Sequence, residues 1–120
     1  MRKNKKKYSI RLYKILFMEL DQKTKNRLEK MILAIIGRYL DLAEYQVFFF
    51  GSRAIAAKGS ERSDIDIGLE GAEAVSLSIM AKIKEDIINL PFLYKIDLVD
   101  FKRVSADFYQ VAKTNIELIN

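Results

Sequence analysis

The stretch SDIDIGL, residues 63–69, alternates polar and apolar side chains without a break. A period of two is the repeat of a β-strand, which predicts Asp64, Asp66 and Gly68 on one face and the apolar residues on the other. Two carboxylates side by side repel each other unless a cation compensates, and oxygen ligands of this kind are what Mg²⁺ prefers. A solvent-facing side of an amphipathic strand explains the same alternation equally well, so the pattern alone leaves both interpretations open.

An upstream apolar run, QVFFF at residues 46–50, ends at Gly51-Ser52. Its continuous hydrophobicity predicts a strand that is covered on both faces. A glycine directly after such a strand lets an anionic ligand approach the backbone N–H groups closely. Taken alone, the pair does not distinguish a phosphate site from an ordinary turn.

Further elements are predicted around these two strands. Helical spacing of apolar residues predicts helices over residues 22–42, 73–89 and 105–119. Asp21 and Ser105 are suitable N-caps for the first and last of these helices. A third strand is predicted over residues 93–101. The order α-β-β-α-β-α indicates a small layered α+β domain, with a mixed sheet flanked by helices.

Asp97 lies inside the third predicted strand, between apolar neighbours. A carboxylate there would be costly if it were buried without a partner. If this strand lies beside the strand of Asp64 and Asp66, three carboxylates converge, and such a triad can hold two Mg²⁺ ions and support an in-line phosphoryl or nucleotidyl transfer. The alternative is an exposed aspartate of no function, which is our interpretation of the nearby Asp100.

The composition excludes several kinds of catalytic and structural chemistry. The chain has no Cys and no His, which excludes disulfides, thiol nucleophiles and a Ser-His triad. Acid–base or metal chemistry must therefore rest on carboxylates, Lys and Tyr. No apolar run approaches the roughly 18 residues of a spanning helix. We expect a cytoplasmic protein without a membrane partner.

Positive charge gathers at the start of the chain. Residues 1–30 hold eleven Lys/Arg and three Asp/Glu, a net charge of +8, whereas the whole chain carries +5, so residues 31–120 sum to −3. We interpret residues 1–19 as a basic extension and residues 20–120 as the folded domain. The seven positive charges of residues 1–14 are typical of a solvated tail, with contact to RNA as the alternative.

The order of three motifs resembles a known family. The run FGSRA (residues 50–54), the run SDIDIG (residues 63–68) and Asp97 resemble the nucleotidyltransferase superfamily that shares the polymerase β palm, and most closely its minimal nucleotidyltransferases. The resemblance implies a palm fold, a nucleoside triphosphate substrate and two Mg²⁺ ions. It implies a nucleotide-binding set of Gly51, Ser52, Arg53 and Ser63, and a catalytic and metal-binding set of Asp64, Asp66 and Asp97.

The resemblance also implies a biological role. Minimal nucleotidyltransferases often pair with a small helical partner of the HEPN type, an RNase toxin, and the antitoxin silences it by transferring AMP from ATP to a tyrosine. One departure is a loop of eleven residues, 53–63, where the family usually has ten; another is Ile55-Ala56 where Arg-Gly is common. Two alternatives therefore stay open: a binding module for nucleotide or partner without turnover, and nucleotide addition to RNA held by residues 1–14.

Overall fold

The computed structural model describes residues 22–51, 65–92 and 95–120. The chain divides into two compact units, Met1–Met31 and Ile32–Asn120. In the first unit, residues 22–31 are helical, and the side-chain amide of Gln22 donates a hydrogen bond to Asn26 one turn later (3.2 Å). The predicted basic extension, residues 1–19, and the predicted cap Asp21 lie outside the described residues.

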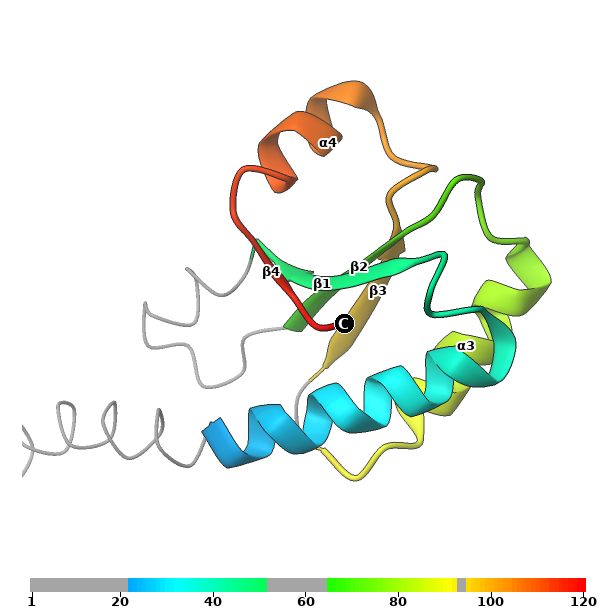
Figure 1. Ribbon diagram of the computed structural model, residues 1–120, viewed down its shortest axis with the longest axis vertical. Helices are drawn as coiled ribbons and strands as arrows, with labels where there is room; N and C mark the ends of the chain where they lie inside the picture. The colour runs from blue at the N-terminus through cyan, green and yellow to red at the C-terminus, as the bar shows by residue number, and fades with distance from the viewer. Residues whose placement is uncertain (1–21, 52–64, 93–94) are drawn as a thin grey trace, which may run out of the picture. The chain divides into compact units, whose positions relative to one another are not determined.

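The second unit is built on a four-stranded sheet with the strand order β3-β2-β1-β4 (Figure 1). The strands are β1 (Gln46–Phe50), β2 (Ile65–Glu70), β3 (Ile96–Asp100) and β4 (Ile116–Leu118). β1 pairs antiparallel with both β2 and β4, whereas β2 and β3 are parallel. Parallel neighbours need a crossover connection, and the helix α3 (Leu77–Ile88) provides it. The mixed sheet with its helices confirms the predicted α+β class.

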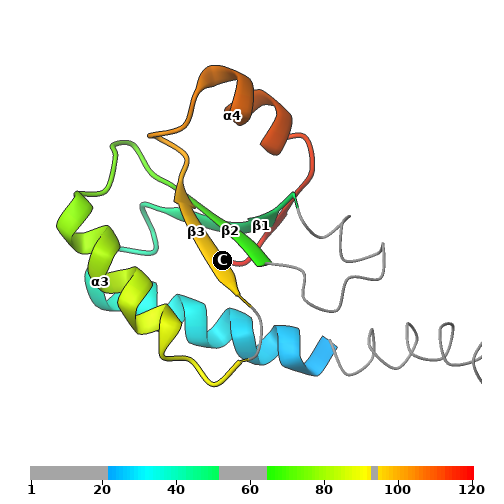
Figure 2. The same ribbon diagram turned by 180° about the vertical axis from the view of Figure 1, so that it is seen from behind.

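Helices lie on both sides of the sheet. Figures 1 and 2 show α3 on one side and the short helix α4 (Ala106–Ala112) on the other. The strand residues that alternate toward the α3 side are buried apolar side chains: Val47, Phe49, Ile67, Leu69 and Leu98. Met80, Ile83 and Ile87 of α3 are buried at the spacing of three and four residues that the sequence predicted. α3 begins later than predicted, because the Ser76 hydroxyl caps it by accepting a hydrogen bond from the Ile79 backbone N–H (3.2 Å).

The helix of residues 22–39 ends three residues before its predicted end. Ile32 and Ile35 are buried as the apolar stripe predicted. A turn follows, in which the Asp41 carboxylate accepts from the Ala43 backbone N–H (2.9 Å). Asx turns of this kind compete with continued helix. Near the end of the helix, the Tyr39 hydroxyl donates to Asp86 of α3 (2.7 Å).

The prediction of one helix over residues 105–119 is wrong in its second half. Ser105 does cap α4, accepting from the Phe108 backbone N–H (3.1 Å). The helix ends at Ala112, however, and residues 116–118 form β4, with Ile116 opposite Phe50 and Leu118 opposite Phe48. The pairing supplies the second neighbour of β1, whose backbone groups on that edge would otherwise lack partners in the sheet.

Candidate active site

Asp66 stands on β2 with its side chain on the α4 side of the sheet. The neighbouring Ile67 is fully buried on the opposite side, whereas Asp66 is half-buried, as the alternation predicted. Its register partner on the antiparallel strand β1 is Phe50. On the parallel strand β3, its register partner is Asp97.

The register therefore brings two predicted site residues together. Residues that are paired across neighbouring strands point to the same face, and neighbouring strands lie about 4.8 Å apart. Asp66 and Asp97 thus present two carboxylates on one face of the sheet. Asp97 is exposed, and it forms no hydrogen bond or ion pair with the described part of the chain. A pair of adjacent carboxylates, one of them open to solvent, is suited to a divalent cation.

Gly51 completes this group from the β1 side. It follows Phe50 directly and has a φ of 59°, in the left-handed region that glycine adopts without strain. A Cβ at this position would lie 3.4 Å from Oδ2 of Asp66. Gly51, Asp66 and Asp97 therefore follow one another across three neighbouring strands.

The remaining predicted site residues, Ser52, Arg53, Ser63 and Asp64, lie outside the described residues. Within residues 22–51, 65–92 and 95–120, no group of three acidic side chains is arranged to hold a metal ion. The predicted third member, Asp64, is separated from Asp66 by one residue of the chain, Ile65.

Aromatic rings pack beside the carboxylates on the same face. Phe48, Phe50 and Phe101 form a buried cluster, with ring centroids of Phe101 4.9 Å from each of the other two. Gly68 makes room for it, since a Cβ there would overlap the ring of Phe48 and lie 2.7 Å from Phe101. The alternation had placed Gly68 on the face of the aspartates and gave it no role in packing. A glycine inside a strand is the available signal for such close packing.

The interpretation of Asp100 as an exposed aspartate is wrong. Asp100 is 5% exposed and accepts hydrogen bonds from the backbone N–H groups of Val75 (2.7 Å) and Lys102 (3.0 Å). Arg103 lies 3.7 Å from the same carboxylate and donates to the Val75 carbonyl (2.9 Å). Asp100 thus ties the segment before α3 to the turn after β3, and Asp97 is the exposed member of the two.

Glu70 links the far end of β2 to α4. Its carboxylate accepts from the Tyr109 hydroxyl (2.8 Å) and from Lys113 Nζ (2.9 Å). Partial burial raises the pKa of Glu70, but the hydrogen bonds and charge of Lys113 and Tyr109 outweigh this, so the net pKa lies below its ordinary value. The hydrogen bond to Glu70 in turn raises the pKa of Lys113. The network fixes α4 over the aromatic cluster.

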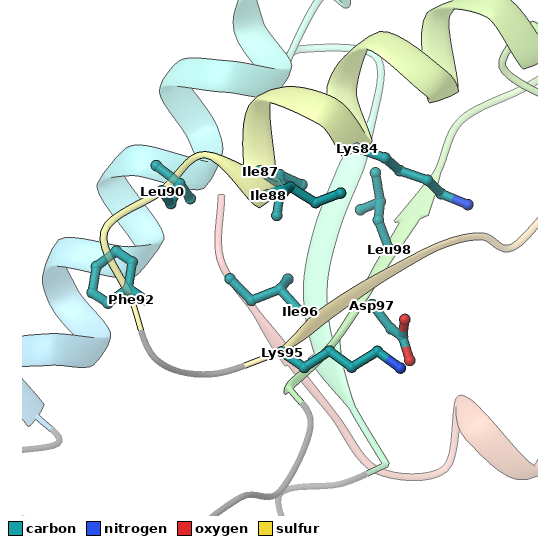
Figure 3. Close-up of a pocket in the computed structure, with 9 residues that line it drawn as sticks. All are labelled: Lys84, Ile87, Ile88, Leu90, Phe92, Lys95, Ile96, Asp97 and Leu98. Carbon is teal, nitrogen blue, oxygen red and sulfur yellow. The ribbon is translucent and has the colours of Figure 1, made fainter.

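A cavity of about 370 Å³ lies next to Asp97, between the end of α3 and the edge strand β3 (Figure 3). Its lining is mostly aliphatic: Ile87, Ile88, Leu90, Ile96 and Leu98. Figure 3 shows the charged ends of Lys84, Lys95 and Asp97 extending to the same side of the view, away from Leu90 and Phe92. The cavity therefore has an apolar interior and a charged opening that includes Asp97.

Comparison with known proteins assigns this arrangement to a class. The family described as "Polymerase beta, Nucleotidyltransferase" matches residues 45–120. That span includes all four strands and both carboxylates, and it exceeds half of the chain. The chain therefore belongs to the polymerase β nucleotidyltransferase family, which confirms the predicted class of enzyme.

Two known proteins show more specifically what this chain is similar to. The chain is 27% identical over 99 residues, 81% of either protein, to "Probable protein adenylyltransferase MntA" of Haemophilus influenzae. Its fold is similar to a solved chain described as "Crystal structure of the toxin-antitoxin with AMP-PNP", with a TM-score of 0.61 and 20% identity over 77% of this chain and 72% of the other. These similarities confirm the predicted resemblance to minimal nucleotidyltransferases. Among the described residues, no helix combines the length and the apolar character needed to cross a membrane.

Proposed function

We propose that this chain is a Mg²⁺-dependent nucleotidyltransferase of the cytoplasm that transfers AMP from ATP to a tyrosine hydroxyl of a HEPN-type helical toxin, and so acts as its antitoxin. The observation that carries the proposal is the register pairing of Asp66 with Asp97, with Gly51 against Asp66. The name of the bacterial relative supports AMP transfer to protein. The solved neighbour, a toxin–antitoxin pair with a non-hydrolysable ATP analogue, supports the nucleotide and the type of partner.

The carboxylates fit a magnesium site by their chemistry. Asp66 and Asp97 offer oxygen ligands from adjacent strands. Asp64, which the period of two in the sequence predicts on the same face as Asp66, is the proposed third ligand. When bound, Mg²⁺ neutralises the negative charge that develops on the phosphates. No Cys or His competes as a ligand, since the sequence has neither.

The proposed roles divide along the sheet. Gly51, with Ser52, Arg53 and Ser63, binds the triphosphate on the β1 side, where the left-handed glycine lets phosphate oxygens approach the backbone. Asp97, exposed at the edge strand β3, faces the acceptor and takes up the proton of its hydroxyl. The hydroxyl oxygen then forms a bond to the α-phosphorus, the bond from that phosphorus to the bridging oxygen breaks, and pyrophosphate leaves.

The test is a transfer assay with α-labelled ATP and Mg²⁺ in lysate of the native host. Wild-type protein should label one small protein, and the Asp64→Asn/Asp66→Asn variant should label none. A matched control is Glu73→Gln, because Glu73 is an exposed carboxylate in the loop before α3. Mass spectrometry of the labelled protein should find AMP on a tyrosine.

Two results would contradict the proposal. Label on RNA would make the chain an RNA nucleotidyltransferase. Labelling by the full chain should then fall steeply with rising salt, and deletion of residues 1–14 should abolish it. No label, together with ATP binding that survives Asp64→Asn/Asp66→Asn, would make it a binding module.

A further inference from the structure

The cavity beside β3 lies on the opposite side of the carboxylate pair from Gly51. Gly51 lies beside the Asp66 carboxylate on the β1 side, whereas Asp97 belongs both to the pair and to the opening of the cavity. If the triphosphate occupies the Gly51 side, as the proposed function requires, the acceptor hydroxyl must approach from the β3 side. The cavity is the concave surface at that edge of the sheet: its apolar interior lies between α3 and β3, on the face opposite the carboxylates, and it opens at Asp97.

The lining of the cavity indicates what kind of molecule it holds. Ile88 is 79% exposed at the end of α3, so part of the apolar lining is open to solvent and accessible to another molecule. Lys84 and Lys95 are exposed at the opening, and neither forms an ion pair with any described side chain. Two lysines and one carboxylate give the opening a net positive charge, and together with the apolar interior this complements an apolar side chain that has an acidic neighbour.

The strand at the opening has a second property. β3 is the last strand of the sheet on its side, with β2 as its only strand neighbour among the described residues. An unpaired edge is a template for an extended segment of another chain, and neighbouring pockets then select its side chains. A polypeptide lying along β3 would pass directly beside Asp97.

We propose that this cavity and the β3 edge form the docking site for the acceptor, a polypeptide segment with an apolar side chain in the cavity and an acidic side chain at Lys84 and Lys95. This inference rests on the proposed function and adds the place and the chemistry of acceptor recognition. An RNA acceptor is disfavoured, because bases stack on aromatic rings and the lining has one, Phe92, among aliphatic side chains. Residues 31–120 also carry ten Lys/Arg against thirteen Asp/Glu, a net charge of −3.

The test uses the full chain with α-labelled ATP, Mg²⁺ and a set of synthetic peptides. Each peptide contains one tyrosine, with flanking positions that are acidic, basic or neutral, and apolar or polar. Wild-type protein should label the peptides with apolar and acidic flanks best. Lys84→Glu/Lys95→Glu should raise the KM for these peptides about tenfold, the factor that the loss of about 1.4 kcal/mol produces, and leave the KM for ATP unchanged. The same variant should gain activity on peptides with basic flanks.

Matched controls come from the same helix. Lys82→Glu changes an exposed lysine of α3 that does not line the cavity, and it should leave the KM for peptides unchanged. Ile88→Ser should raise the KM for peptides with apolar flanks, whereas Leu77→Ser, at another exposed apolar residue of α3 (69%), should not. Because all these side chains are exposed, neither the double lysine variant nor the three single variants should lower the melting temperature appreciably.

Each other outcome decides against the inference in its own way. Labelling that ignores the flanks and the lysines would place acceptor recognition elsewhere, and a raised KM for ATP would assign the cavity to the nucleotide. Label on oligonucleotides but on no peptide would overturn the polypeptide acceptor. Pyrophosphate release without peptide labelling would mean that water accepts the AMP, and it would overturn the docking site alone. Absence of pyrophosphate release under all conditions would instead contradict the proposed function.

Discussion

Asp66 and Asp97 are register partners on two parallel strands that are separated by α3 in the sequence. The pairing depends on the crossover, since α3 returns the chain to lie parallel to β2 in the register that sets these two positions opposite each other on one face. It places one carboxylate in the middle of the sheet and the other at its edge. The sheet itself therefore fixes the spacing of the two backbone positions from which the carboxylates extend.

Replacement of either carboxylate should abolish transfer and leave the fold intact. Asp66→Asn and Asp97→Asn keep the shape of each side chain but remove the charge that a divalent cation requires. We expect nucleotidyl transfer to fall by about 10²-fold or more for each variant, the scale of a lost electrostatic contribution to catalysis. Labelled-ATP transfer measured beside circular dichroism melting checks this, with Glu73→Gln as the control of equal charge change. Variants that keep more than half of the wild-type rate would refute the assigned roles.

Asp100 should behave in the opposite way, although it lies only three residues from Asp97. Asp100→Ala leaves the Val75 and Lys102 backbone N–H groups without their buried acceptor. We expect a loss of about 1–3 kcal/mol in the free energy of unfolding, or a melting temperature lower by roughly 5–15 °C. Urea unfolding of Asp100→Ala and Asp97→Ala in parallel separates the two residues. Equal stability of the two variants would contradict the structural role of Asp100.

The sequence was sufficient where local pattern and tertiary structure agree. The alternation of residues 65–69 predicted both the strand and the face of Asp66, because period two needs no knowledge of the partner strands. Helical spacing likewise predicted α3, since its buried residues face one layer of the core. The class of fold follows from the order of these elements.

The remaining errors concern residues whose environment is set by distant parts of the chain. Asp100 is buried because Val75, twenty-five positions earlier, supplies its hydrogen-bond donor. Leu118 lies seven residues after Val111, a helical spacing, and two residues after Ile116, a strand spacing, and the open edge of β1 decides between them. The cavity beside Asp97 could not be predicted either, because it forms only where α3 crosses over β3.

Gly68 should tolerate no side chain. Gly68→Ala would drive its Cβ into the rings of Phe48 and Phe101, which are packed in a cluster with little freedom to move. Overpacking of this kind costs about 1–3 kcal/mol, and here we expect the upper end of that range. Gly37→Ala is the control, since Gly37 lies in a helix and its Cβ would meet only the movable end of the Leu42 side chain (3.3 Å). Thermal unfolding should show a large loss for Gly68→Ala and a change below about 1 kcal/mol for Gly37→Ala; equal losses would contradict the packing described.

The ion pair of Glu70 and Lys113 should make stability depend on pH at the acidic end. Because the folded state lowers the pKa of Glu70, its contribution is complete above the ordinary glutamate pKa of about 4.3 and is lost as the pH falls through the folded value. The pKa of Lys113 shifts in the opposite direction: it is raised, so the contribution of Lys113 to stability is lost only as the pH rises through a value above 10.5. Between these limits we expect Glu70→Gln to lower the free energy of unfolding by about 1–3 kcal/mol, because both partners are partly buried and their bond is charge-assisted. Urea unfolding of wild type and Glu70→Gln from neutral to acidic pH should show the gap between them closing below the ordinary glutamate pKa, whereas the exposed control Glu44→Gln should show no gap at any pH. A gap that stays constant down to strongly acidic pH would mean that Glu70 stabilises α4 by packing rather than by its charge.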